Sequence, residues 1–195
     1  MTFLRINAGA ENPVPHAAQR ISPPQSLHEN LAVALRASGP VILMIHGYKY
    51  APNADMRCPH THIFSLRTPS RGRRAVSWPR RLGFGRQMDR GGVGIAFGWN
   101  SQGGIRVARQ QADVAGRALA RLIRQIRALD SQRQVHILAH SLGGHVALSA
   151  MHSLAPFDVD RVVLMNPAVY QGQAAAALQT VAGKTCEVYN VTSRE

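Results

Sequence analysis

Short apolar runs alternate with helical segments along most of this chain, and no other feature constrains its fold as strongly. The first run is Val41–Ile45, and its apolar character indicates a strand covered on both faces. Similar runs follow at 93–99, 134–139, 161–165 and 186–191. Strands joined by helical crossovers run parallel, and helices cover both faces of their sheet. The sequence therefore predicts an α/β protein, a three-layer α/β/α sandwich with a mainly parallel sheet.

Helical periodicity is clearest after Gly104, where apolar residues recur at spacings of three and four as far as Ile126. Within this helix we expect Asp113 to pair with Arg117, one turn later. Further helices are expected at 142–154 and 173–181, and a short strand at 75–78.

The residues before the first run predict a short strand, irregular chain and then one helix. Ser26 and Glu29 have the spacing of a capping box, with a hydroxyl at the N-cap and a carboxylate three residues later. This pattern predicts a helix that ends near Ala37, before a Gly-Pro pair.

Length and composition indicate one globular domain over residues 1–195, of which 45% are hydrophobic. No apolar run approaches the roughly 20 residues that span a bilayer, and the N-terminus lacks a signal-peptide pattern. The two cysteines, Cys58 and Cys186, are expected to be reduced thiols. Together these features favour a cytoplasmic protein.

The formal net charge is +13 at pH 7, and eight arginines lie between Arg67 and Arg90. Such a field can attract nucleic acid, an anionic membrane surface or acidic substrates. No nucleic-acid-binding motif accompanies the arginines, so we do not expect nucleic acid as a partner. A solvated basic surface and a peripheral contact with anionic partners both stay open. The stretch 48–90 is predicted to be an insert that forms a lid or a substrate-selecting loop.

The sharpest chemical signal is the string AHSLGG at 139–144, which lies between a predicted strand and a predicted helix. A nucleophilic serine in such a place needs a strained turn that lifts its hydroxyl above the edge of the sheet. Small residues on both sides of Ser141 allow the close approach that the turn requires, with Gly143 after it and Ala139 in place of the usual glycine before it. The alternative is a serine that only caps the helix.

A second signal, His46-Gly47-Tyr48, ends the first apolar run. Glycine allows this loop to approach the serine turn, and an oxyanion hole needs two backbone donors. We expect the amides of Tyr48 and Leu142 to be those donors. His46 is expected to shape the loop through hydrogen bonds.

The pairing of VILMIHGY with VHILAHSLGGHVAL resembles the α/β-hydrolase superfamily, in its esterase and lipase branches. GIAFGWNS, followed by a long helix, resembles an uncharacterised bacterial hydrolase branch of it. The resemblance covers 41–195 apart from the Arg-rich insert. It implies a serine nucleophile, then an acid after a later strand and a histidine after the last strand. It also implies a small-molecule ester or acyl substrate and no cofactor, and leaves the oligomeric state open.

The sequence departs from that pattern after the run at 186–191. Glu195 is the candidate acid, or the acid lies beyond it, and no histidine follows His152. We expect an α/β-hydrolase fold truncated before its last strand, which leaves an unpaired edge and uncovered apolar surface. The base that activates Ser141 would then come from outside this chain. The alternative is a non-catalytic α/β-hydrolase-like module that binds anionic partners through its arginines.

Of the remaining histidines, His140 is expected to support the site from its place beside Ser141, with its side chain pointing away from the Ser141 hydroxyl. His145 and His152 should be packed or exposed on the following helix. Cys58, His60 and His62 alternate along an extended segment and could share a zinc ion, but no fourth ligand has convincing spacing. A polar loop without metal is the favoured interpretation of that segment.

Overall fold

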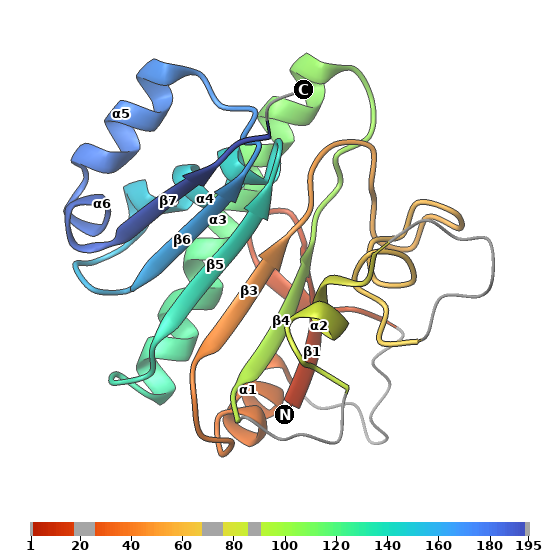
Figure 1. Ribbon diagram of the computed structural model, residues 1–195. Helices are drawn as coiled ribbons and strands as arrows, with labels where there is room; N and C mark the ends of the chain where they lie inside the picture. The colour runs from red at the N-terminus through yellow and green to blue at the C-terminus, as the bar shows by residue number, and fades with distance from the viewer. Residues whose placement is uncertain (1, 18–25, 68–75, 86–90, 194–195) are drawn as a thin grey trace.

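The computed structural model describes residues 2–17, 26–67, 76–85 and 91–193. Its centre is a seven-stranded sheet with the order β2-β1-β4-β3-β5-β6-β7 (Figure 1). The strands are β1 (Thr2–Ala8), β2 (Pro13–Pro15), β3 (Val41–Ile45), β4 (Val93–Gly98), β5 (Val135–His140), β6 (Arg161–Met165) and β7 (Glu187–Val191). Among the strands of the described residues, the pairing of β2 with β1 is antiparallel and every other pairing is parallel. The predicted mainly parallel sheet is confirmed.

Helices lie on both faces of the sheet. They are α1 (Leu27–Ala34), α2 (Trp78–Arg81), α3 (Ile105–Leu129), α4 (Gly143–Ala150), α5 (Gln171–Gln179) and α6 (Val181–Thr185), with a 3₁₀ turn at Met151–Ser153. Figure 1 shows α3 and α4 behind the sheet and α2 in front of it. The predicted three-layer α/β/α architecture is confirmed. In the part of the chain that the structure describes, no helix is both long and apolar enough to cross a membrane.

Local sequence explains where two of these helices lie. Glu29 donates its amide to Ser26 Oγ at 3.2 Å, and its carboxylate accepts the Ser26 amide at 2.7 Å, so the capping box is present. The helix it opens ends at Ala34, earlier than predicted. The long helix α3 buries one stripe of small and aliphatic residues against the core, as its periodicity predicted.

Several sequence predictions are corrected. The short strand expected at 75–78 is wrong where the structure describes it, because Ser77 caps α2 by accepting the Arg80 amide at 3.3 Å. The helix expected at 173–181 is two helices, because the Thr180 hydroxyl caps α6. The irregular chain expected after the first strand contains β2.

The expected pair of Asp113 with Arg117 is also wrong. Arg117 Nε donates to Glu11 at 2.8 Å, because the turn before β2 brings Glu11 to the outer side of α3. Asp113 instead lies 2.7 Å from His145 Nε2, across the interface with α4.

The two halves of the sheet differ in the cover on their second face. Met44 on β3 is fully buried there with Phe64 and Phe84, which belong to the segments on either side of α2. The residues paired with Met44 in successive strands are Leu138, Val163 and Tyr189. Leu138 and Val163 are partly exposed, and Tyr189 on β7 is 49% exposed. Apolar surface is therefore open to solvent over β5 to β7 in the described structure.

Candidate active site

The backbone is strained where β5 meets α4. Ser141 has φ 52°, in the left-handed region, which costs a residue with a side chain roughly 1–2 kcal/mol. Its amide donates to Met165 O at 3.0 Å, and its carbonyl accepts the Ala168 amide at 3.0 Å. The neighbouring strand β6 and the loop after it thus fix the turn. The N-cap of α4 is Leu142, without a side-chain bond, so Ser141 does not cap the helix in the ordinary way.

The loop after β3 packs directly against this turn. A Cβ atom added to Gly143 would lie 2.5 Å from the His46 carbonyl oxygen, and one added to Gly47 would lie 2.9 Å from Ser141 Cβ. Both distances are shorter than a real Cβ atom can accept, so only glycine fits at either position. The two sequence motifs, almost a hundred residues apart, therefore meet at one edge of the sheet.

The hydrogen bonds of the first turn of α4 leave donors free at this edge. Gly144 donates to Ser141 O and His145 donates to Leu142 O. The amides of Leu142 and Tyr48 have no acceptor among the residues that the structure describes. The Ser141 hydroxyl likewise has no hydrogen-bond partner there. Free donors at a helix N-terminus are suited to a developing negative charge.

His46 is fully buried, and its hydrogen bonds hold the loop after β3. The Trp99 amide donates to His46 Nε2 at 3.0 Å, so Nδ1 carries the proton and donates to Gly47 O at 2.8 Å. The Trp99 indole stacks on the His46 ring and donates to the His46 carbonyl at 3.0 Å. Burial lowers the pKa of His46 from 6.5 to about 4, against the effect of its two backbone bonds. The ring is neutral near pH 7 and has no free nitrogen for Ser141.

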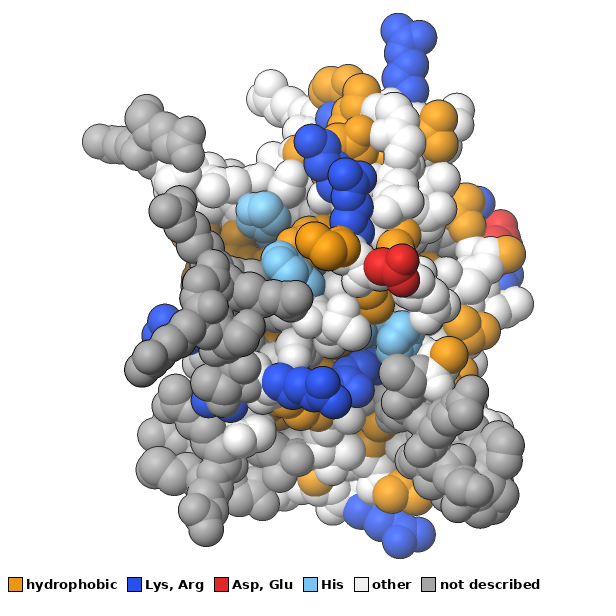
Figure 2. Space-filling model, turned by 90° about the vertical axis from the view of Figure 1, so that its right-hand side faces the viewer, with side chains coloured by type: hydrophobic (Ala, Val, Ile, Leu, Met, Phe, Trp, Pro, Cys, Tyr) orange, Lys and Arg blue, Asp and Glu red, His pale blue; other side chains and the backbone are white. Residues whose placement is uncertain are grey.

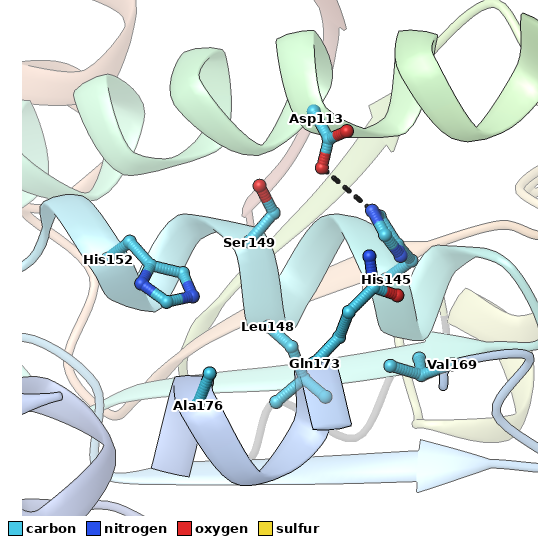
Figure 3. A pocket seen from close by; sticks show the side chains of 8 residues that line it. All are labelled: Asp113, His145, Leu148, Ser149, His152, Val169, Gln173 and Ala176. Carbon is cyan, nitrogen blue, oxygen red and sulfur yellow. Dashed lines mark hydrogen bonds and ion pairs between the residues drawn. The ribbon is translucent and has the colours of Figure 1, made fainter. Parts of the chain in front are cut away.

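In the described residues, His140, His145 and His152 make no hydrogen bond to the Ser141 hydroxyl. The His140 ring lies edge-on to Trp78 at 6.2 Å, and partial burial lowers its pKa. His145 points toward Asp113 from a small pocket of about 140 Å³ between α3, α4 and α5 (Figure 3). His152 lines the same pocket from the 3₁₀ turn that follows α4.

The side chains of Cys58, His60 and His62 do not converge. His60 is buried and its Nε2 lies 2.7 Å from Asn7 Oδ1, whereas His62 Nδ1 lies 3.0 Å from the Tyr50 hydroxyl. Burial, with His16 close by, lowers the pKa of His60 to about 2. Within the described ranges, no group of three or more His, Cys, Asp or Glu side chains could hold a metal ion.

Two predicted features lie partly or wholly outside the described residues. Glu195, the candidate acid, is one of them. Of the eight arginines between 67 and 90, the structure describes Arg67, Arg80 and Arg81. Figure 2 shows that the described basic side chains on this face stand in separate groups among histidines and apolar residues.

Two residues at the carboxyl edge of the sheet, Trp99 and Ser101, were not predicted to take part in this site. Both follow β4, which is the neighbour of β3 in the sheet. Because parallel strands end at the same edge, the segment after β4 was a candidate to support the loop after β3. The string GIAFGWNS contains both residues, but nothing in it indicated that their side chains bond to the loop after β3.

The strand order with β3 at its centre, the strained serine turn after β5 and the glycine loop against it define an α/β-hydrolase fold. Residues 24–192 match the family described as alpha/beta hydrolase of unknown function (DUF900), and the chain belongs to this family. The predicted resemblance to the α/β-hydrolase superfamily is therefore confirmed.

Two solved structures of acetylxylan esterase are similar to this chain, each with 12% sequence identity. One is described as determined at 0.90 Å and has a TM-score of 0.46, covering 78% of this chain and 83% of the esterase. The other, an iodinated complex, has a TM-score of 0.48 and covers 81% and 84%. No curated protein matches the sequence significantly.

Proposed function

We propose that this protein is a serine hydrolase that acts on carboxylic esters or related acyl bonds, with Ser141 as its nucleophile. Membership of an α/β-hydrolase family supports a hydrolase. The observation that carries the proposal is the left-handed backbone of Ser141, φ 52°, on a residue with an unpartnered hydroxyl. Strain of this kind persists where the surrounding structure enforces it, and it clusters at functional sites.

In the proposed reaction, Ser141 Oγ attacks the acyl carbon of the ester, and its proton passes to a base. The amides of Leu142 and Tyr48 hold the oxyanion of the tetrahedral intermediate, which then expels the alcohol and leaves an acyl-enzyme. Water attacks this acyl-enzyme, releases the carboxylic acid and restores the Ser141 hydroxyl. His46, Gly47 and Gly143 support the geometry of the two loops.

The base is the part of the mechanism that the described residues do not supply. All nine histidines lie in the described ranges, and none of them makes a hydrogen bond to the Ser141 hydroxyl there. We therefore infer that the base comes from outside these 195 residues, and that Glu195 is a candidate for the acid that orients it. The insert at 48–90 is proposed as the lid, and its arginines favour substrates with an anionic part.

Labelling with a fluorophosphonate tests the nucleophile directly. The protein in its full-length form, with the base supplied, is expected to be labelled at Ser141 and to hydrolyse p-nitrophenyl acetate, whereas Ser141→Ala in the same form should do neither. Every variant below is compared with the wild type in that form. Ser149→Ala is the matched control, because Ser149 lies on α4 but lines the pocket in Figure 3, and it should behave as the wild type. A wild-type protein without label, or a Ser141→Ala protein that still reacts, would overturn the proposal.

A second candidate function is a non-catalytic module that binds anionic partners. It is favoured because no histidine in the described residues is hydrogen-bonded to the Ser141 hydroxyl. This alternative predicts no label at Ser141, together with binding to heparin that weakens steeply as salt is raised. Replacing the exposed Arg67 and Arg81 by glutamate should then weaken the binding further. A protein that is labelled at Ser141 and does not bind heparin would exclude it.

A further inference from the structure

We propose that Ser101 is a positioning residue that orients the Tyr48 amide toward the oxyanion of the reaction. The inference rests on the proposed function and adds a residue that neither the motifs nor the family assigns. Ser101 follows β4, and its side chain is fully buried. A buried hydroxyl has to find hydrogen-bond partners, and all of its partners belong to the loop after β3.

The Ser101 hydroxyl sits inside the turn that this loop makes. Lys49 has φ 74°, which reverses the chain between Gly47 and Tyr50. Ser101 Oγ lies 2.9 Å from Gly47 O and accepts the Tyr50 amide at 2.9 Å. One hydroxyl therefore links the carbonyl at the start of the turn to the amide at its end.

Backbone bonds place Ser101 firmly in this position. The Ser101 amide donates to Tyr50 O at 2.8 Å, and the Lys49 amide donates to Ser101 O at 3.2 Å. Ser101 Oγ is also 2.8 Å from Tyr50 O, which already accepts the Ser101 amide. The hydroxyl proton is thus shared between Gly47 O and Tyr50 O, while Gly47 O also receives the proton of His46 Nδ1.

Because the peptide bond is planar, fixing the Gly47 carbonyl also fixes the direction of the Tyr48 N–H. In a trans peptide, the Gly47 carbonyl and the Tyr48 N–H lie in one plane and point in opposite directions. Ser101 and His46 hold the carbonyl toward the protein interior, so the Tyr48 N–H points outward. Gly47 packs against Ser141, since a Cβ on Gly47 would lie 2.9 Å from Ser141 Cβ. The free Tyr48 donor is therefore presented beside the nucleophile.

Orientation of this kind matters because an oxyanion hole stabilises charge only if its donors are already aligned. Removing one such donor costs about 10²–10³ in kcat. Ser101 is one of two groups that hold the carbonyl, so its loss should cost part of that effect, roughly tenfold. The loss should fall on kcat, because the aligned amide acts on the transition state rather than on the bound ester.

The test measures kcat and KM for p-nitrophenyl acetate in Ser101→Ala, with Ser101→Thr as the variant that keeps the hydroxyl. We expect kcat to fall roughly tenfold in the alanine variant with KM within about twofold, and to recover to within about threefold in the threonine variant. Thr180→Ala is the matched control. Its hydroxyl also bridges two backbone groups, Ala177 O and Gly183 N, at the α5–α6 junction.

Thr180→Ala should lose a similar amount of thermal stability and keep its kcat. A Ser101→Ala protein with wild-type kcat would overturn the inference, as would an equal loss of kcat in the control. Failure of the proposed function looks different, because Ser141→Ala would then react as fast as the wild type. An inactive Ser141→Ala beside a fully active Ser101→Ala would remove only the role of Ser101.

A second readout needs no turnover. In ¹⁵N–¹H spectra the wild-type Tyr48 amide should give one sharp resonance, because its peptide plane is held in one orientation. In Ser101→Ala this resonance should broaden or double, and Ser101→Thr should restore it. A Tyr48 resonance that keeps its position and width in the alanine variant would also overturn the inference.

Discussion

The two segments that meet at the candidate site are stabilised in opposite ways. At the loop after β3, the His46 ring is buried and hydrogen-bonded, and so is the Ser101 hydroxyl that reaches this loop from the segment after β4. In the turn after β5, Ser141 has a left-handed backbone and a hydroxyl without a partner in the described structure.

The difference teaches how such a site can be held together. A strained turn persists only when rigid neighbours over-determine its conformation. Here the loop after β3 provides that rigidity through its internal bonds and through the glycine contacts that lock it against the turn. The strained turn after β5 holds the proposed nucleophile Ser141, and the hydrogen-bonded loop after β3 supports that turn.

The largest effect is expected at Ser141, where activity and stability should move in opposite directions. Ser141→Gly should abolish hydrolysis, because the hydroxyl is lost, and should stabilise the fold by about 1 kcal/mol, because glycine adopts φ 52° without strain. Ser141→Ala loses the same hydroxyl without relief of strain. Urea unfolding of the two variants separates the effects, and equal stabilities would show that the turn is not strained.

A methyl group between the two segments should have the next largest effect. In Gly143→Ala the new Cβ would lie 2.5 Å from His46 O and 2.7 Å from Ile45 O, both backbone atoms that cannot easily move. We expect a loss of about 1–3 kcal/mol in unfolding free energy, together with lower hydrolysis.

Gly172→Ala is the control for that substitution. Gly172 lies in α5, and nothing lies within 4 Å of the added Cβ, so alanine there should stabilise the helix slightly. A Gly143→Ala protein as stable as this control would show that the two segments are not in tight contact.

Lowering the pH should reduce the unfolding free energy by a moderate amount, through His46 in the loop after β3. The pKa of His46 is about 4 in the folded protein against an ordinary value of 6.5, so between these pH values the unfolded chain binds more protons. Stability should therefore fall as pH decreases from about 6.5 to about 4, by roughly 1 kcal/mol per pH unit for this group. His60, whose folded pKa is about 2, adds a similar slope over a wider range.

Denaturant unfolding between pH 7 and pH 4 measures this slope. Replacing His46 by glutamine removes one titrating group, so the variant should be less stable at pH 7 and should lose stability more slowly on acidification. A His46→Gln protein with the wild-type slope would show that His46 is not the group that titrates.

The smallest effect is expected away from both segments, at the pair of Asp113 and His145. Asp113→Asn keeps a hydrogen-bonding side chain beside His145 and lies outside the proposed machinery. We expect kcat to change by less than about twofold, because the substitution removes no contact with the transition state. A fall of a hundredfold would instead show that this pair serves Ser141 as its base.

Local pattern predicted most of the core of this fold. Each of the five apolar runs became a strand. Burial explains this best for β4, which is buried at every residue, and least for β7, which is largely exposed. Periodicity likewise identified α3, and the spacing of Ser26 and Glu29 identified the start of α1. These features depend on residues close together in the chain, which is why the sequence contains them.

Predictions that depended on residues far apart in the sequence were less accurate. Asp113 and Arg117 have the spacing of an ion pair, but each found a better partner in another element, His145 and Glu11. The break at Thr180 was missed because apolar residues continue through it.

By itself, the sequence determined the class of fold and the two motifs that meet at the carboxyl edge of the sheet. Tertiary structure alone decided that Trp99 and Ser101 hold the loop after β3, and that no histidine of the described chain is hydrogen-bonded to the Ser141 hydroxyl. The reason is physical. Periodicity reports which face of an element is buried, whereas a hydrogen bond depends on strand order, which brings β4 beside β3 although some fifty residues separate them.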